Sequence, residues 1–171
     1  MSRCAVVGAG AWGTALADLL ARNGHDVALW AYEPDVVESI NNRHENTRFL
    51  AGAALSPALR ATGDFADALG GATLVCVATP AQHLRAILRR GASSLPARAT
   101  VCVASKGIER DTLALMSDVV AEEAPGRRVV ALSGPSFAAE VMARQPTAVV
   151  AASDDEFAAE MIQDSFSNAT F

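Results

Sequence analysis

The stretch CAVVGAGAWGTA, residues 4–15, decides the fold. Its apolar start predicts a buried strand, and the residues after it have the spacing of an amphipathic helix. Between the two lie Gly8, Gly10 and Gly13 in the pattern GxGxxG, which is typical of a loop that holds the pyrophosphate of a dinucleotide. The motif lies in a complete βαβ unit of about 30 residues, made of a strand, the turn, a helix and a second strand, and this context makes the evidence for dinucleotide binding strong. The alternative is that the three glycines only permit a turn.

Each glycine of this loop has a separate predicted task. Gly8 makes the tight turn, Gly10 lets the backbone approach the pyrophosphate, and Gly13 lets helix and strand pack closely. The pyrophosphate is expected to rest on free N–H groups at the positive end of the helix dipole, beside Ala11.

Short apolar runs alternate with amphipathic stretches along the rest of the chain. Strands are predicted over 4–7, 27–31, 60–62, 74–78, 100–104, 128–132 and 147–152, with the start of another at 169–171. Helices are predicted over 11–22, 80–90, 111–123 and 137–143, and after Pro34, Asp64 and Ser153. Asp64, Asp111 and Ser153 are the expected caps of their helices, and 44–59 is expected to be a loop.

Strands that alternate with helices of this length predict a parallel sheet covered on both faces. We therefore expect an α/β fold of the Rossmann type, with a doubly wound, mainly parallel sheet. The 171 residues fit one domain, and residues 1–171 are predicted to form a single NAD(P)-binding domain.

The tip of the second strand bears on which dinucleotide is bound. NAD sites place an acid about 20 residues past the last glycine, where it accepts hydrogen bonds from the ribose diol, and Glu33 lies at that distance. No arginine for the 2′-phosphate of NADP stands in 31–34, which favours NAD. Glu33 could equally cap the helix that begins at Pro34, so both interpretations stay open.

Two further motifs follow predicted strands. Ser105-Lys106-Gly107 comes after the strand 100–104, and SGPSFA, residues 133–138, comes after the strand 128–132. Ligands of open α/β sheets collect outside the carboxyl ends of strands, so both motifs should share one rim with the glycine loop. A lysine there offers a compact charge for a phosphate, although both motifs could also be ordinary strand-to-helix turns.

Charge and cysteine usage exclude some classes of partner and site. The net charge of −5, without a basic stripe, argues against nucleic acid, and the doublets Arg89-Arg90 and Arg127-Arg128 are interpreted as solvated surface. The three cysteines lie in apolar runs without metal-ligand spacing, which predicts reduced, buried thiols, no metal site and a cytoplasmic protein. A redox or nucleophilic cysteine is the alternative. The sequence contains no stretch of about 18 apolar residues, so no membrane span is expected.

The chain resembles the bacterial glycerol-3-phosphate dehydrogenase family. The resemblance is carried by GAGAWGTALA (8–17), LW (29–30), NTRFL (46–50), SKGIE (105–109) and SGPSFAAEV (133–141), in order over essentially the whole chain. It implies interconversion of dihydroxyacetone phosphate and sn-glycerol 3-phosphate with NAD or NADP, which supplies a glycerophospholipid precursor. A homodimer is possible.

The resemblance also implies roles for particular positions. Trp12 and Tyr32 would line the cofactor, Lys106 would touch cofactor and substrate, and Ala138 would lie on the nicotinamide side. Gly134 and Ser136 would contact the phosphate-bearing substrate. Hydrophobic packing is the alternative role for Trp12.

Two departures from the family pattern matter. Members that prefer NADPH often carry a basic residue where this chain has Ala31-Tyr32, so their preference does not transfer. Family chains also continue for about as many residues again, into a helical domain that supplies the proton-transfer lysine. We therefore assign no catalytic residue here and expect the chain alone to be inactive. The alternatives are a hydroxy-acid dehydrogenase related to 6-phosphogluconate dehydrogenase, and a binding module that holds NAD(P) without chemistry.

Overall fold

A computed structural model describes residues 1–171 and contains one large sheet and one small hairpin. The strands of the large sheet are β1 (Arg3–Val7), β2 (Asp26–Trp30), β5 (Arg60–Thr62), β6 (Leu74–Val77), β7 (Thr100–Val103), β8 (Arg128–Ser133) and β9 (Val150–Ala152). Their order across the sheet is β5-β2-β1-β6-β7-β8-β9, and every neighbouring pair is parallel except β8 with β9. The predicted doubly wound, mainly parallel sheet is confirmed.

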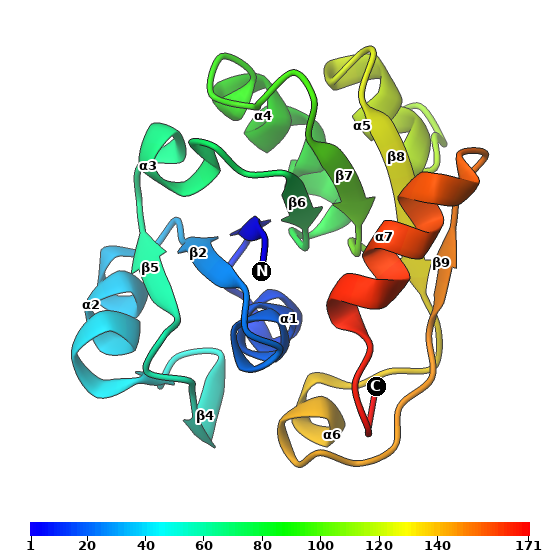
Figure 1. Cartoon of the computed structure of the whole chain (residues 1–171). Helices are drawn as coiled ribbons and strands as arrows, with labels where there is room; N and C mark the ends of the chain where they lie inside the picture. The colour runs from blue at the N-terminus through cyan, green and yellow to red at the C-terminus, as the bar shows by residue number, and fades with distance from the viewer.

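Helices cover both faces of this sheet (Figure 1). They are α1 (Ala11–Arg22), α2 (Pro34–Arg43), α3 (Phe65–Leu69), α4 (Ala81–Gly91), α5 (Met116–Glu123), α6 (Ala138–Met142) and α7 (Glu156–Phe166). Buried side chains of α1, α2 and α7 pack in one core, and those of α3, α4 and α5 pack in the other. The sheet lies between the two layers, as the alternation of strands and helices predicts.

Strand β1 shows how the two cores form. Cys4 and Val6 face the α1 side, whereas Ala5 and Val7 face the α4 side, and all four are buried. Successive side chains of a strand point to opposite faces, so a strand covered on both sides reads as a continuous apolar run. This is why the short run 4–7 is apolar at every position.

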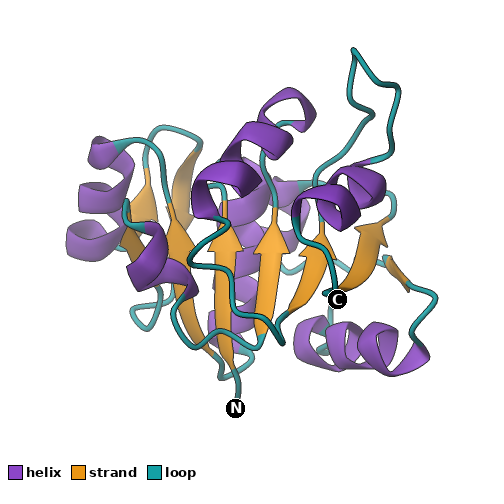
Figure 2. Ribbon diagram, turned by 90° about the horizontal axis from the view of Figure 1, so that it is seen from above, coloured by secondary structure: helices purple, strands orange, loops and turns teal.

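The point where the strand order reverses positions the site. The chain winds outward from β1 through β2 to β5, then returns to the other side of β1 as β6 and continues through β7 to β8. Figure 2 shows the parallel strands side by side, with their arrowheads at a common edge. Loops that leave β1 and β6 diverge at this edge and leave a crevice between them, which is where ligands of open α/β sheets bind.

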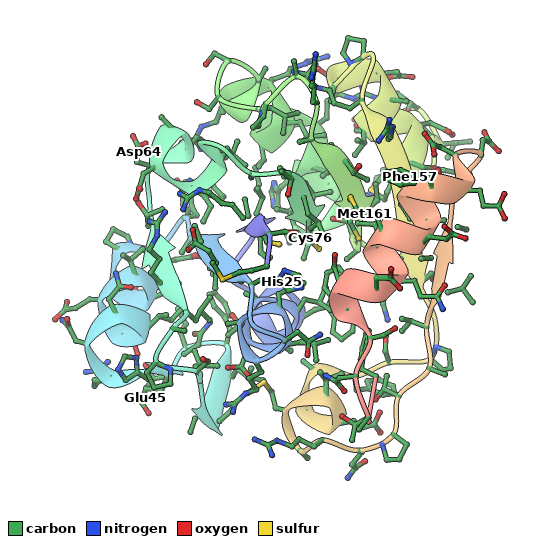
Figure 3. The ribbon with its side chains drawn as sticks, viewed as in Figure 1. His25, Glu45, Asp64, Cys76, Phe157 and Met161 are labelled. Carbon is green, nitrogen blue, oxygen red and sulfur yellow. The ribbon has the colours of Figure 1, made fainter.

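The predicted thiols are confirmed as free and buried. Cys4, Cys76 and Cys102 lie on the three central strands, and Figure 3 shows Cys76 in the interior of the molecule. Burial raises the pKa of Cys4 to about 12, and contact with Cys76 together with burial raises the pKa of Cys102. Such thiols stay protonated at neutral pH and are poor nucleophiles.

Several local predictions were wrong. Segment 44–59 is not all loop, because β3 (Glu45–Asn46) and β4 (Leu50–Ala54) form an antiparallel hairpin. Residues 169–171 form no strand, since the oxygen of the Asn168 side chain folds the end into a turn by accepting from the N–H groups of Thr170 and Phe171. Helix α7 is capped by Asp155, which accepts from the N–H of Ala158, rather than by Ser153.

Helix α5 also begins later than predicted. Its N-cap is Leu115, four residues beyond Asp111, because 107–115 folds back on itself through a bridge between Ile108 and Leu115. Asp64 is confirmed as the cap of α3, where it accepts from the N–H of Asp67 at 2.8 Å. None of the helices has both the length and the apolar character needed to cross a bilayer.

Candidate functional site

A cavity of about 1080 Å³ lies at the crevice between the carboxyl ends of β1, β2, β6 and β7. Ligand pockets commonly measure about 300–1,000 Å³, so this one suits a large ligand such as a dinucleotide. The predicted site residues that line it are Gly8, Gly10, Ala11, Trp12, Tyr32, Glu33, Lys106, Ser136 and Ala138. Gly13 and Gly134 are not among the residues that line it, and a Cβ on either would collide with a backbone oxygen.

The three glycines of the loop have the environments that their predicted tasks require. Gly8 has a φ of +112°, and a Cβ on it would meet the carbonyl oxygen of Ala78 at 2.9 Å. A Cβ on Gly13 would lie 1.9 Å from the carbonyl oxygen of Gly8. These two positions need glycine for reasons inside the protein, namely the turn and the close contact between helix and strand.

Gly10 differs from both, because its surroundings leave room for a side chain. Its φ of −66° and ψ of 178° suit any residue, and a Cβ there would meet no protein atom within 4 Å. No contact inside the protein therefore requires glycine at this position, which is the N-cap of α1 and lines the cavity. This open space is what the predicted close approach of a ligand phosphate to the backbone would use.

Unpaired polar atoms also fit a dinucleotide at this wall. The buried Nε1 of Trp12 and the buried Oγ1 of Thr79 have no hydrogen-bond partner in the protein, and both residues line the cavity. Buried polar groups are rarely left unpaired, so these two atoms mark a wall whose polar groups the protein itself does not satisfy. The first turn of α1 contains no acidic side chain that would repel a phosphate.

Asn46 braces the glycine loop from the hairpin, a role that the sequence did not indicate. The side chain is completely buried, and its Nδ2 donates to the carbonyl oxygen of Ala9 at 2.9 Å and to Oγ1 of Thr14 at 2.8 Å. Its Oδ1 accepts from the N–H of Phe49, which itself lines the cavity. Strand β3, only two residues long, thus holds the loop in place.

Lys106, Gly134 and Ser136 meet at the other end of the cavity. Nζ of Lys106 donates to the carbonyl oxygen of Ser136 at 3.2 Å, to its Oγ at 3.3 Å and to the carbonyl oxygen of Gly134 at 3.5 Å. The ammonium also lies 5.3 Å from the centre of the Trp12 ring. The two strand-end motifs therefore form one cluster around a single cation, beside the glycine loop.

The tip of β2 and the end of α4 form the remaining wall. Glu33 occupies the N-cap position of α2, but its side chain makes no capping hydrogen bond. Tyr32 is 70% exposed and lines the cavity. Arg90, at the end of α4, lines the same end, although the doublet Arg89-Arg90 was interpreted only as solvated surface.

The sequence of this chain matches one family model over residues 3–159, described as NAD-dependent glycerol-3-phosphate dehydrogenase N-terminus. The chain belongs to this family. The resemblance in the strand-end motifs is thereby confirmed, and so is a nicotinamide dinucleotide, NAD or NADP, as the cofactor class.

Curated relatives of this dehydrogenase family agree with the match. Proteins named glycerol-3-phosphate dehydrogenase [NAD(P)+] are 45% identical over 99% of this chain in Geobacter sp. and 51% identical over 89% of it in Paramagnetospirillum magneticum. The aligned part is 51% and 55% of those proteins, so the chain spans about half the length of the curated relatives it matches.

Solved structures show the same relationship. The glycerol-3-phosphate dehydrogenase of Coxiella burnetii superposes with a TM-score of 0.93 at 32% identity, covering 99% of this chain and 52% of that one. A UDP-glucose dehydrogenase from Pyrobaculum islandicum superposes with a TM-score of 0.73 at 23% identity over all of this chain and 45% of that one, which shows a shared fold alone.

Helix α4 anchors the segment that follows Lys106. Arg85 bonds both carboxylate oxygens of Glu109 at 2.8 Å and also pairs with Glu122 and Glu123 of α5. Gln82 donates to the carbonyl oxygen of Ile108. These bonds hold 107–115 in its turn and thereby keep Lys106 at the cavity.

This anchor predicts a dependence of stability on pH. The hydrogen bonds from Arg85 and then Thr112 lower the pKa of Glu109 to about 2, from an ordinary value of 4.5. A carboxyl with a lowered folded-state pKa stabilises the fold above its unfolded-state pKa, and that stability is lost as pH falls from about 4.5 towards 2. We expect Glu109→Gln to lower the thermal midpoint at about pH 6 and to flatten its fall below about pH 4.5.

Thermal unfolding followed by circular dichroism across this range checks the prediction. Glu38→Gln, at an exposed acid of α2 outside the ion pairs, is the matched control and should leave the profile unchanged. If the thermal midpoint of Glu109→Gln falls below about pH 4.5 as steeply as that of the unaltered chain, the proposed role of Glu109 as an anchor is contradicted.

Proposed function

We propose that this chain is the cofactor-binding part of an NAD(P)-dependent sn-glycerol-3-phosphate dehydrogenase, which reduces dihydroxyacetone phosphate to a glycerophospholipid precursor. The observation that carries the proposal is the cluster of Lys106, Gly134 and Ser136, because it places a cation beside a dinucleotide cavity. Such a cation suits a substrate that carries a phosphate. The named activity of the relatives supports the choice of substrate.

Residues 1–171 act in this proposal as one NAD(P)-binding domain. A bound nicotinamide dinucleotide supplies the hydride. The start of α1 holds its pyrophosphate at Gly8, Gly10 and Ala11, with Trp12, Tyr32, Glu33 and Ala138 along its length. Gly13 acts indirectly, by letting α1 pack against the loop. Lys106 lies where it can touch both the cofactor and the phosphate-bearing substrate.

Proton transfer to the carbonyl oxygen is assigned outside these residues. Lys106 is the only lysine of the chain, and its Nζ already donates to three oxygen acceptors of the cluster. Lys106 is therefore assigned a binding role, because a lysine cation at this rim suits a substrate that carries a phosphate. We therefore propose that the 171-residue chain binds the cofactor but does not turn over substrate by itself.

A chimera tests the proposal. Residues 1–171 are joined to the second half of the Geobacter relative, and oxidation of NADPH and NADH is followed with dihydroxyacetone phosphate. We expect activity in the chimera and none in the chain alone. Lys106→Met in the chimera should raise the KM for dihydroxyacetone phosphate about tenfold or more, the cost of one charge-assisted bond.

The other outcomes identify the alternatives. Activity with a hydroxy acid instead of dihydroxyacetone phosphate would indicate an enzyme related to 6-phosphogluconate dehydrogenase. Cofactor binding without turnover in the chimera would favour a binding module. Arg98→Met, at an exposed cation away from the cavity, is the control for Lys106→Met and should leave the KM unchanged.

A cytoplasmic location belongs to the same proposal. Its support is the burial of three free thiols, which persist in reducing compartments.

A further inference from the structure

Arg90 is a cation without an ionic partner at one end of the cavity. It makes no ion pair, and no hydrogen bond of its side chain is formed. Its guanidinium carbon lies 5.9 Å from the ring centre of Tyr32 and 5.8 Å from that of Phe65. Tyr32 and Glu33 line the same end of the cavity.

The other arginines of α4 behave differently. Arg85 binds three carboxylates, and Arg89 pairs with Glu123 through two hydrogen bonds. These two face α5, whereas Arg90 lies on another side of the helix, toward the tip of β2. The position of Arg90 is therefore not explained by a need to neutralise an acid.

Aromatic rings hold the guanidinium in place without neutralising its charge. The ring of Phe65 stacks on that of Trp30 with centroids 4.3 Å apart and planes 14° apart, and Trp30 is buried. Arg90 lies over this stack and beside Tyr32. Contacts between guanidinium and aromatic faces orient an arginine, and the N–H groups remain free to bind a ligand.

The ligand atom that such an arginine would meet follows from the fold. In doubly wound sheets the adenosine ribose of the dinucleotide lies at the tip of the second strand, here next to Tyr32 and Glu33. NADP differs from NAD by a phosphate on the 2′ oxygen of that ribose, and arginine binds phosphate with two parallel hydrogen bonds. Because the chain carries a net charge of −5, this phosphate needs a local cation.

We propose that Arg90 binds the 2′-phosphate of NADP(H) and gives this chain its affinity for the phosphorylated cofactor. Arg90 takes the place of the arginine that the β2 tip lacks, from a helix that is distant in sequence. Glu33 acts in the opposite direction, since a carboxylate at this end accepts hydrogen bonds from an unmodified ribose diol and repels a phosphate. This inference rests on the proposed function.

Paired titrations test the assignment. Trp12 and Trp30 both line the cavity, so energy transfer from tryptophan to the reduced nicotinamide reports binding of NADPH and NADH to the full 171-residue chain. We expect Arg90→Gln to weaken NADPH binding about tenfold to a hundredfold and to change NADH binding less than about threefold. Arg89→Gln removes the same charge one residue away and should spare the ratio of the two affinities.

Each other outcome overturns the inference in a recognisable way. Equal weakening of NADPH and NADH in Arg90→Gln would assign Arg90 to the adenine or to the wall in general. If the ratio of the NADPH and NADH affinities is unchanged in Arg90→Gln, Arg90 does not bind the 2′-phosphate. If Arg89→Gln changes that ratio equally, the effect comes from the overall charge of the protein and not from a contact of Arg90. Failure of the unaltered chain to bind either dinucleotide would instead reject the proposed function, and the inference with it.

Discussion

Gly13→Ala is expected to destabilise the fold by about 3 kcal/mol or more, the upper range for an overpacked site. Within a helix the same change normally stabilises by about 1 kcal/mol, so the expected sign is reversed. The cause is the contact between α1 and the loop, where the new Cβ would lie 1.9 Å from the carbonyl oxygen of Gly8 and 3.2 Å from Cβ of Ala78. Both neighbours belong to the sheet edge, and neither is the end of a flexible side chain.

Urea unfolding of the unaltered chain and the variant measures this effect. Gly10→Ala is the control, because Gly10 has an ordinary backbone conformation and open space around it. Gly24→Ala would not serve, since Gly24 has a φ of +87°. Gly10→Ala should therefore cost about 1 kcal/mol or less, as expected at a helix N-cap. Equal stabilities of Gly13→Ala and the unaltered chain would contradict the packing role of this glycine.

Much of the site could be predicted because its parts are local in sequence. The glycine loop, Lys106 and the turn at 133–138 each follow directly on an apolar strand, and parallel strands deliver their carboxyl ends to one edge. The pattern thus places Lys106 and Ser136 on the same rim, and the structure joins them at 3.3 Å.

Other parts depend on contacts that no local pattern encodes. Asn46 reaches Ala9 and Thr14 across more than 30 residues, from a two-residue strand too short to show any alternation. Arg90 comes to the tip of β2 from the last turn of α4. In the sequence Arg90 is indistinguishable from Arg89, and only the orientation of the helix separates an ion-paired arginine from one at the cavity.

The predicted start of helix α5 was wrong for a similar reason. Asp111 has the residue type of a helix cap, but 107–115 is held by Arg85 and by the bridge between Ile108 and Leu115. Tertiary contacts therefore delay the start of α5 beyond the site of best local propensity.

Gly10→Ala is expected to abolish dinucleotide binding while leaving the fold intact. The added methyl group meets no protein atom within 4 Å, so it extends into the cavity where the phosphates would approach the backbone. We expect the affinity for NADH and NADPH to fall together by about a hundredfold or more, the equivalent of about 3 kcal/mol. This separates Gly10 from Gly13, whose substitution acts first on stability.

The central claim is that the glycine loop and the start of α1 hold a dinucleotide, and a fluorescence titration tests it most directly. The unaltered chain and Gly10→Ala are titrated with NADH and NADPH at equal protein concentration, after circular dichroism has shown equal folding. We predict saturable binding by the unaltered chain and almost none by Gly10→Ala. Equal affinities of the two proteins, or no binding by the unaltered chain, would contradict the claim.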